Sequence, residues 1–214
     1  MELVHAFVDL LLHLDVHLVD FTLKYGFWVY VFLFCVVFCE TGLVVTPFLP
    51  GDSLLFAAGV CAGGALLGYW QVLFVLFAAG VLGDGCNYFL GRFFGPVIFK
   101  RETRWLKKEY LLKAHMFYER HGGKAIILAR FIPIIRTFAP FVAGIALMRP
   151  YLFFFFNVTG CVLWVFGLVS AGYFLGNQAW VKSHFNLIVY GIIFVSLLPM
   201  IIGFVKSKLS KKTI

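Results

Sequence analysis

Two acidic and two basic residues lie in the most apolar parts of this chain. Glu40 and Asp52 bracket the stretch ETGLVVTPFLPGD, which follows the apolar run FWVYVFLFCVVFC. Arg130 and Arg136 lie in AIILARFIPIIRTFAPFVAGIALM. Carboxylates accept protons and cations, and guanidinium groups bind carboxylates and other anions. The pattern indicates a charged site within apolar surroundings.

The cost of charge in a membrane predicts how these residues are arranged. One charge at the bilayer centre costs about 2.5–3.5 kcal/mol on insertion scales. Four are tolerable only where they meet one another or water. We therefore expect the four side chains to converge in a polar cavity, with Glu40 facing Arg130.

Simpler roles are open to the same residues. Asp52 would serve only as a helix cap, Glu40 only as a structural ion-pair partner, and Arg130 would extend to the membrane interface. Arg136 lies between two prolines and is harder to explain in this way.

Three more polar residues lie in apolar segments. Asp84, in GDGCNY, would either join the cavity or pair locally. Asn157 is a second candidate for the cavity, although Asn157 and Asn87 also suit hydrogen bonds between neighbouring helices.

Composition indicates an integral membrane protein. Hydrophobic residues make up 62% of the 214 residues and charged residues only 13%, about half the share usual in soluble domains. The formal net charge is +8, but nine of the 18 lysines and arginines lie between Arg92 and Lys124. Basic residues beside apolar runs are typical of the cytoplasmic side of a membrane protein, so nucleic acid is not the expected partner.

Prolines predict that two of the apolar segments turn back rather than cross. The prolines of 125–148 break its helix, and freed backbone groups cannot face lipid. The stretch TPFLPGD follows the same logic. We expect two re-entrant hairpins, with these residues breaking or shaping them: Pro47, Pro50, Gly51, Pro133, Pro140 and Gly144.

The remaining segments complete a single membrane domain over residues 1–214. Runs 70–91 and 151–176 are long enough to cross, whereas 25–46 is either a span or a long hairpin arm. Tryptophans, Trp164 among them, lie near run ends as in an interfacial belt. The expected order is an amphipathic helix (1–22), a first repeat (25–91), a cytoplasmic basic connector (92–124), a second repeat (125–176), a final span (185–205) and a cytoplasmic tail (206–214).

An internal repeat supports this order. YFLG occurs at 88–91 and 173–176, and at the same offset of 85 the Ala-Gly at 58–59 matches 143–144. Each half then contains a hairpin followed by one span. Because a span changes sides and a hairpin does not, the two halves are expected in opposite orientations.

Enzyme chemistry is not indicated. The five cysteines and six histidines lack metal-ligand spacing, and we find no nucleophile–base pattern or nucleotide-binding loop. We expect no catalytic residues, no metal and no cofactor.

Four longer motifs resemble the DedA family of membrane proteins, which is related to the VTT-domain (SNARE-associated) proteins of eukaryotic endomembranes. They are ETGLVVTPFLPGDSLLFAAG, GDGCNYFLGRFFG, FYERHGGKAIILARFIPIIRTFAPFVAGIALM and FFFFNVTGCVLW, in the family's order over about residues 35–176. The family's acidic pair falls on Glu40 and Asp52, and its arginine pair on Arg130 and Arg136.

The resemblance implies lipid transport. Bacterial members are associated with returning polyprenyl (undecaprenyl) phosphate across the inner membrane, linked to the proton motive force. Arg130 and Arg136 would then bind the phosphate head group, and Glu40 and Asp52 would couple protons. The expected partners are membrane lipids and protons, with homo-oligomers left open. We expect a multi-pass protein of the bacterial inner membrane, because the chain shows no targeting segment.

Other functions stay open at this point. Related proteins scramble phospholipids, and the same acids suit a proton-coupled antiporter of small cations, although arginines in the cavity argue against a cationic substrate. A membrane scaffold is a further alternative, but it has no need for buried charge.

Overall fold

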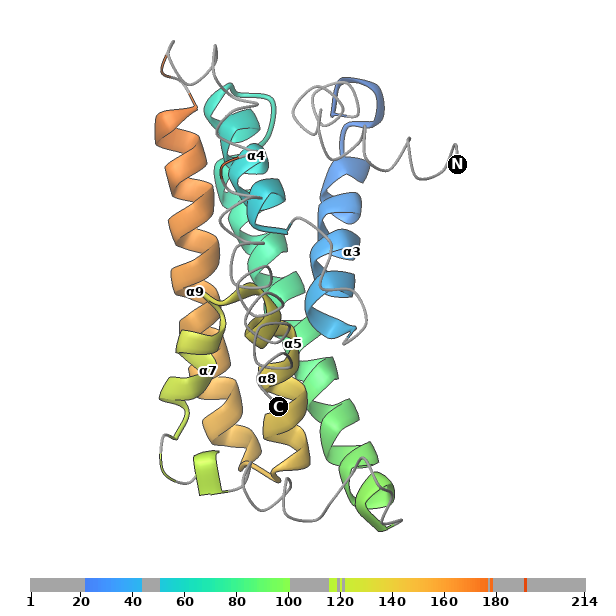
Figure 1. Ribbon diagram of the computed structural model, residues 1–214. Helices are drawn as coiled ribbons and strands as arrows, with labels where there is room; N and C mark the ends of the chain where they lie inside the picture. The colour runs from blue at the N-terminus through green and yellow to red at the C-terminus, as the bar shows by residue number, and fades with distance from the viewer. Residues whose placement is uncertain are drawn as a thin grey trace, which may run out of the picture. The chain divides into compact units, whose positions relative to one another are not determined.

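The computed structural model describes residues 22–43, 51–100, 116–118, 120, 122–176, 178 and 191. All elements of this part are α-helices (Figure 1), as the sequence predicts. They are α3 (Trp28–Gly42), α4 (Gly51–Gly63), α5 (Tyr69–Lys100), α7 (Lys124–Ala129), α8 (Pro133–Ile145) and α9 (Pro150–Leu175).

Contacts divide the chain into two compact units, which are described separately. Unit 1 comprises Met1–Phe32, Pro50–Leu73 and Leu168–Ile214, and unit 2 comprises Leu33–Leu49 and Phe74–Gly167. Helices α3, α5 and α9 contribute residues to both units. Unit 2 contains α7, α8 and the greater part of the three shared helices.

Two helices are long and apolar enough to cross a membrane by length and composition, Tyr69–Gly95 and Pro150–Leu175. They coincide with the predicted runs 70–91 and 151–176. Helix α3 has 15 residues, fewer than the about 20 of a spanning helix, and residues 44–50 lie outside the described part. The choice between a span and a hairpin arm for 25–46 therefore stays a prediction.

Several predicted segments lie outside the described residues. They are the amphipathic helix 1–22 apart from residue 22, the turn residues Pro47 and Pro50, residues 101–115, 119 and 121 of the connector, the final span 185–205 apart from residue 191, and the tail 206–214.

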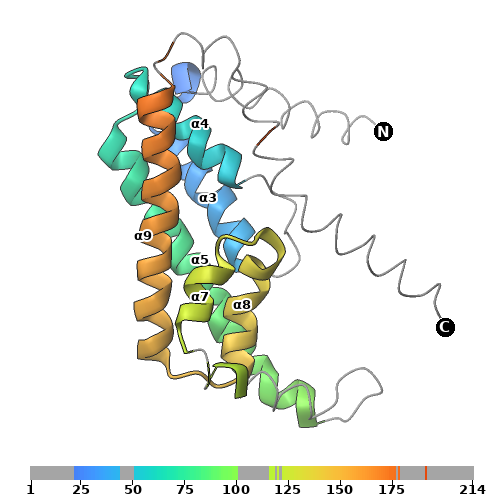
Figure 2. The same ribbon diagram turned by 60° about the vertical axis from the view of Figure 1, so that its left-hand side comes forward.

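The predicted break in 125–148 is present, and Pro133 explains it. Helix α7 ends at Ala129 and α8 begins at Pro133. Ile132, which precedes the proline, is extended with φ −116° and ψ 107°, as the proline ring requires of its neighbour. At the first position of a helix the missing N–H of proline costs nothing. The two helices lie side by side in Figure 2.

The prediction was wrong for Pro140, which lies inside α8 and does not end it. The helix continues to Ile145 although one backbone hydrogen bond is lost at this proline. Gly144 also belongs to α8 rather than to a break, and Gly51 is the first residue of α4.

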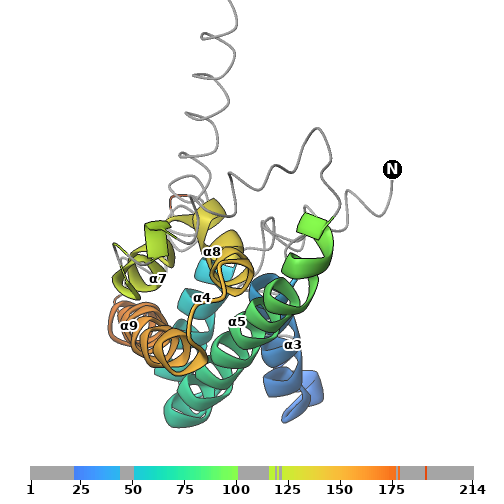
Figure 3. The same ribbon diagram turned by 90° about the horizontal axis from the view of Figure 1, so that it is seen from below.

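Glycines allow α8 to approach α5 closely within unit 2. A Cβ at Gly144 would overlap the carbonyl oxygen of Tyr88 and lie 2.7 Å from the amide nitrogen of Arg92. A Cβ at Gly91 would overlap the carbonyl oxygen of Phe141. Figure 3 shows α8 between α7 and α5. Small residues at such crossings are typical of membrane helices.

Unit 1 contains a corresponding crossing of α4 and α9. A Cβ at Gly59 would overlap the carbonyl oxygen of Val169 and lie 3.1 Å from the Cα of Gly172. Gly59 and Gly144 are the glycines matched by the repeat offset of 85. The matched halves thus use matched glycines, while their opposite orientation stays a prediction.

The YFLG tyrosines also have corresponding stacking contacts. Tyr173 lies 4.6 Å from Tyr69 between ring centroids in unit 1, and Tyr88 lies 4.2 Å from Phe153 in unit 2. Tyr88 also donates a hydrogen bond to the carbonyl of Met148. In unit 2 these contacts join α5 to the start of α9 and to the residues just before it.

Replacing Gly144 by alanine should destabilise the protein, because the new Cβ has no room between α8 and α5. Overpacking of this kind costs about 1–3 kcal/mol, so we expect a lower midpoint of thermal unfolding in detergent. Gly167→Ala is the matched control, since no atom lies within 4 Å of a Cβ at Gly167. Equal midpoints for the two variants would contradict the close crossing.

Candidate functional site

The first half of the site is an ion pair between α3 and α8. Arg136, in the first turn of α8, donates through Nη2 to Oε1 of Glu40, near the end of α3. The side chains are only 6% and 1% exposed. Because both charges are buried, loss of either partner would leave the other uncompensated.

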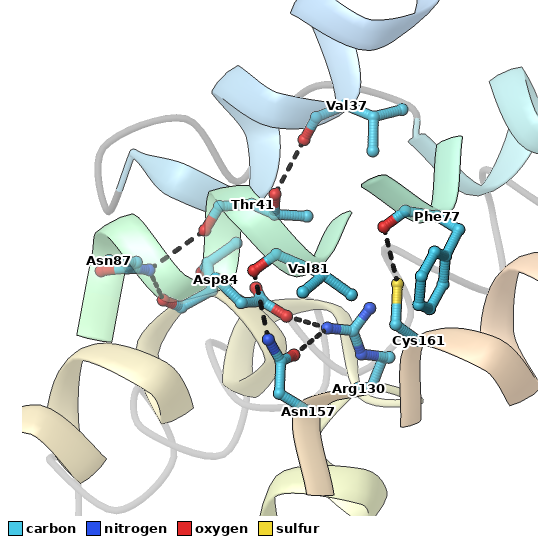
Figure 4. Close-up of polar contacts among 10 residues, drawn as sticks. Val37, Thr41, Phe77, Val81, Asp84, Asn87, Arg130, Asn157 and Cys161 are labelled. Carbon is cyan, nitrogen blue, oxygen red and sulfur yellow. Dashed lines mark hydrogen bonds and ion pairs between the residues drawn. The ribbon is translucent and has the colours of Figure 1, made fainter. Parts of the chain in front are cut away.

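The second half is an ion pair between the break and α5. Arg130, which directly follows α7, pairs through Nη2 with Oδ2 of Asp84. The same nitrogen donates to Oδ1 of Asn157 on α9 at 2.7 Å, and Asn157 in turn donates to the carbonyl of Val81 at 3.3 Å. Figure 4 shows these three polar side chains converging from α5, α9 and the break.

Trp164 brings the two arginines together. The guanidinium carbon of Arg136 lies 4.8 Å from the centre of its ring system, and that of Arg130 lies 5.4 Å away. Both distances are within the range of cation–π attraction. Two like charges over one indole repel each other, so each requires its own carboxylate. The four ionised side chains sum to zero formal charge.

Asn87 positions the Glu40–Arg136 pair. Its amide nitrogen donates to the carbonyl of Thr41 at 3.2 Å and to that of Thr137 at 2.7 Å. These carbonyls belong to the residues that follow Glu40 and Arg136 in the chain. One side chain of α5 therefore connects the backbones that carry both members of the pair. Figure 4 shows its contact with Thr41.

Glycines provide the space for these contacts. A Cβ at Gly83 would overlap the hydroxyl of Thr41, and one at Gly42 would lie 3.3 Å from the Cα of Gly83. Beside Arg130, a Cβ at Gly80 or Gly160 would lie 3.6 Å from its guanidinium nitrogens. The site is thus enclosed by backbone on the α5 and α9 sides.

Two buried acceptor atoms on α5 remain available. Oδ1 of Asp84 and Oδ1 of Asn87 are buried and accept no hydrogen bond from any described residue. A buried acceptor without a donor is costly. Oδ1 of Asp84 is consequently an acceptor atom of the site that Arg130, bound at Oδ2, does not occupy.

The structure changes the predicted pairing. Glu40 contacts Arg136 rather than Arg130, and Asp84 is the partner of Arg130. Arg130 does not extend to an interface, since it is only 4% exposed. Asp84 and Asn157 join the charged site, which is one of the two roles that the sequence analysis predicts for each of them.

Asp52 lies in unit 1, in the first turn of α4. Because α4 begins at Gly51, Asp52 lies within the helix rather than capping it from outside. An acid in the first turn stabilises the N-terminal end of the helix dipole. Its expected approach to Glu40 stays a prediction.

The prediction of an interfacial belt is wrong for Trp164, and sequence reasoning missed its role in the site. The residue is 3% exposed and lies in the middle of α9. Its position 14 residues after Pro150, well inside an apolar helix, was the available signal. Thr41 and Thr137 were also missed, because they act through backbone carbonyls. No group of three or more potential metal ligands occurs in the part of the chain described.

Apolar helices of spanning length and a buried, neutralised cluster of four charges define a helical membrane protein with an internal polar site. A VTT domain model matches residues 49–174, which include every charged residue of the site except Glu40. The chain is 49% identical over 212 residues to Protein DedA of Escherichia coli K12, covering 97% of this chain and 96% of that protein. The chain belongs to the DedA family of membrane proteins.

Other relatives of the chain are also named as membrane proteins. Inner membrane protein YqjA of Escherichia coli K12 is 37% identical over 151 residues, covering 69% of this chain and 68% of that protein. An uncharacterized membrane protein of Mycobacterium leprae, ML0287, is 44% identical over 169 residues, covering 78% and 76%. No solved structure gives a significant match.

A pair of double-mutant cycles tests the pairing. We expect Glu40→Gln with Arg136→Gln to be less destabilising than the sum of the single changes by about 1–3 kcal/mol, since the double variant leaves no lone buried charge. Glu40→Gln with Arg130→Gln is the matched cycle and should be closer to additive. Unfolding in detergent measures both, and a larger coupling in the second cycle would restore the original pairing.

Proposed function

We propose that this protein carries a phosphate-headed lipid, polyprenyl phosphate, across the bacterial inner membrane together with protons, driven by the proton motive force. The observation that supports the proposal is the pair of guanidinium groups held over Trp164, each neutralised by its own buried carboxylate. The inner membrane location is supported by the name of a relative, Inner membrane protein YqjA.

The number of arginines suits a phosphate monoester. A guanidinium binds phosphate oxygens through two parallel N–H donors. Monoesters carry about −1.5 to −2 charges near neutral pH, whereas the diester of a common phospholipid carries one. Arg130 and Arg136 together match the charge of polyprenyl phosphate, and the contact of both with one indole supports binding of a single head group by the two.

Charge balance connects the lipid to protons. When the arginines turn to the phosphate, Glu40 and Asp84 lose their cations, and a carboxylate alone in apolar surroundings is protonated more readily. Two protons on the acids and a doubly charged phosphate on the arginines leave the site neutral again. Asp84 therefore takes the place in the proton step that the sequence assigned to Asp52.

The same balance argues against a cation antiporter. A cation site needs net negative charge, whereas each described acid of this site already has an arginine partner. Scrambling of phospholipids is the alternative that the transport experiment separates.

The test is transbilayer movement of a short-chain polyprenyl phosphate in proteoliposomes, with and without an imposed proton gradient. We expect Arg136→Gln to reduce the rate at least tenfold, since a charge-assisted hydrogen bond contributes about 1.5–3 kcal/mol. Asp84→Asn should reduce the response to the gradient. Arg149→Gln, at an exposed arginine outside the site, is the control and should behave as wild type.

Three results would contradict the proposal. Full transport by Arg136→Gln would remove the arginines from head-group binding. An unchanged gradient response in Asp84→Asn would remove Asp84 from proton coupling. Equal movement of ordinary phospholipids without a gradient would indicate a scramblase.

A further inference from the structure

An apolar groove lies on unit 2 between α7, α8 and the residues that precede α7. Its volume is about 860 Å³, within the range of pockets that hold a small organic ligand. Apolar side chains form most of its lining, among them Phe117, Leu128, Ile132, Ile135, Phe138 and Val142.

The hairpin of α7 and α8 presents the groove on one face and the charged site on the other. Leu128, Ile135 and Phe138 line the groove and are exposed, whereas Arg130 and Arg136 are buried. The groove residues of α8 recur every three to four positions, which is the spacing of one helix face. Figures 2 and 3 show the two helices that carry both faces.

The charged residues of the groove lie at and before the N-terminal end of α7. Among its lining residues the charged ones are Arg120 and Lys124, and both are cations and exposed. Lys124 is the first residue of α7, so both cations precede or begin the helix whose later residues are apolar. A basic group beside an apolar surface is the arrangement that binds anionic lipid at a membrane.

Tyr118 helps to hold the groove together. Its hydroxyl donates to the carbonyl of Ala139 at 2.9 Å, joining the segment before α7 to α8. Burial raises the pKa of Tyr118, so the phenol keeps its proton and this hydrogen bond at neutral pH. The groove is therefore a preformed feature rather than a gap between unconnected helices.

We propose that this groove binds one anionic phospholipid of the surrounding bilayer, with an acyl chain along α7 and α8 and the phosphate at Arg120 and Lys124. Exposed cations are screened by solvent and need no exact charge match, so Arg120 and Lys124 suit a phosphodiester, whereas the enclosed arginine pair of the transport site requires a balanced charge. The site is separate from head-group binding by Arg130 and Arg136 and does not depend on the proposed transport.

Photo-crosslinking in nanodiscs of equal phosphatidylglycerol and phosphatidylcholine tests the proposal. A photoreactive phenylalanine analogue is placed at Phe138 in the groove, or at Phe155, an exposed position of α9 outside the groove, as the matched control. The crosslinked lipids are identified by mass spectrometry. We expect at least a threefold preference for phosphatidylglycerol at Phe138 and a ratio near one at Phe155.

Second variants decide the cause of the preference. Arg120→Gln with Lys124→Gln should return the ratio at Phe138 to that at Phe155 while lipid is still crosslinked at both positions. The double variant Glu40→Gln with Arg136→Gln, which leaves no lone buried charge, should leave the preference intact, and this separates the groove from the transport site. Equal ratios at the two positions, or a preference that survives removal of both cations, would overturn the proposal.

Discussion

The structure depends on the neutralisation of two arginines that share one indole. A buried guanidinium is tolerated only with a partner, and removal of one member of a buried pair typically costs about 3–5 kcal/mol. Two guanidiniums beside each other double this requirement. Helices α3 and α5 each supply one carboxylate, and α9 supplies the indole and an amide. The contacts that form the site are therefore also the contacts that hold the helices of unit 2 together.

The break before Pro133 makes the shared indole possible. Arg130 and Arg136 are six residues apart, and in a continuous helix, at 3.6 residues per turn, they would point about 120° apart. The extended Ile132 interrupts the helix between them, so both side chains reach Trp164. The break between α7 and α8 thus allows two arginines of one segment to belong to one site.

Glycine determines how closely the supporting helices approach. The crossings at Gly83, Gly144 and Gly59 bring backbone against backbone. Without side chains at these points, short residues such as Asp84 and Asn87 reach across to neighbouring helices. Such packing is the usual basis of association where lipid removes the hydrophobic driving force between helices. The matched glycines at an offset of 85 show that both halves of the chain use it.

The sequence by itself determined the helical membrane class, the family, the long apolar helices, the break at Pro133 and most of the charged residues of the site. These features follow from composition, proline chemistry and periodicity, which act over a few neighbouring residues. Only the tertiary structure decided that Glu40 pairs with Arg136 and Asp84 with Arg130, that both arginines lie against Trp164, and that α8 continues through Pro140. Glu40 and Arg136 are 96 residues apart, and helix packing, which no local pattern encodes, selects which acid each arginine meets.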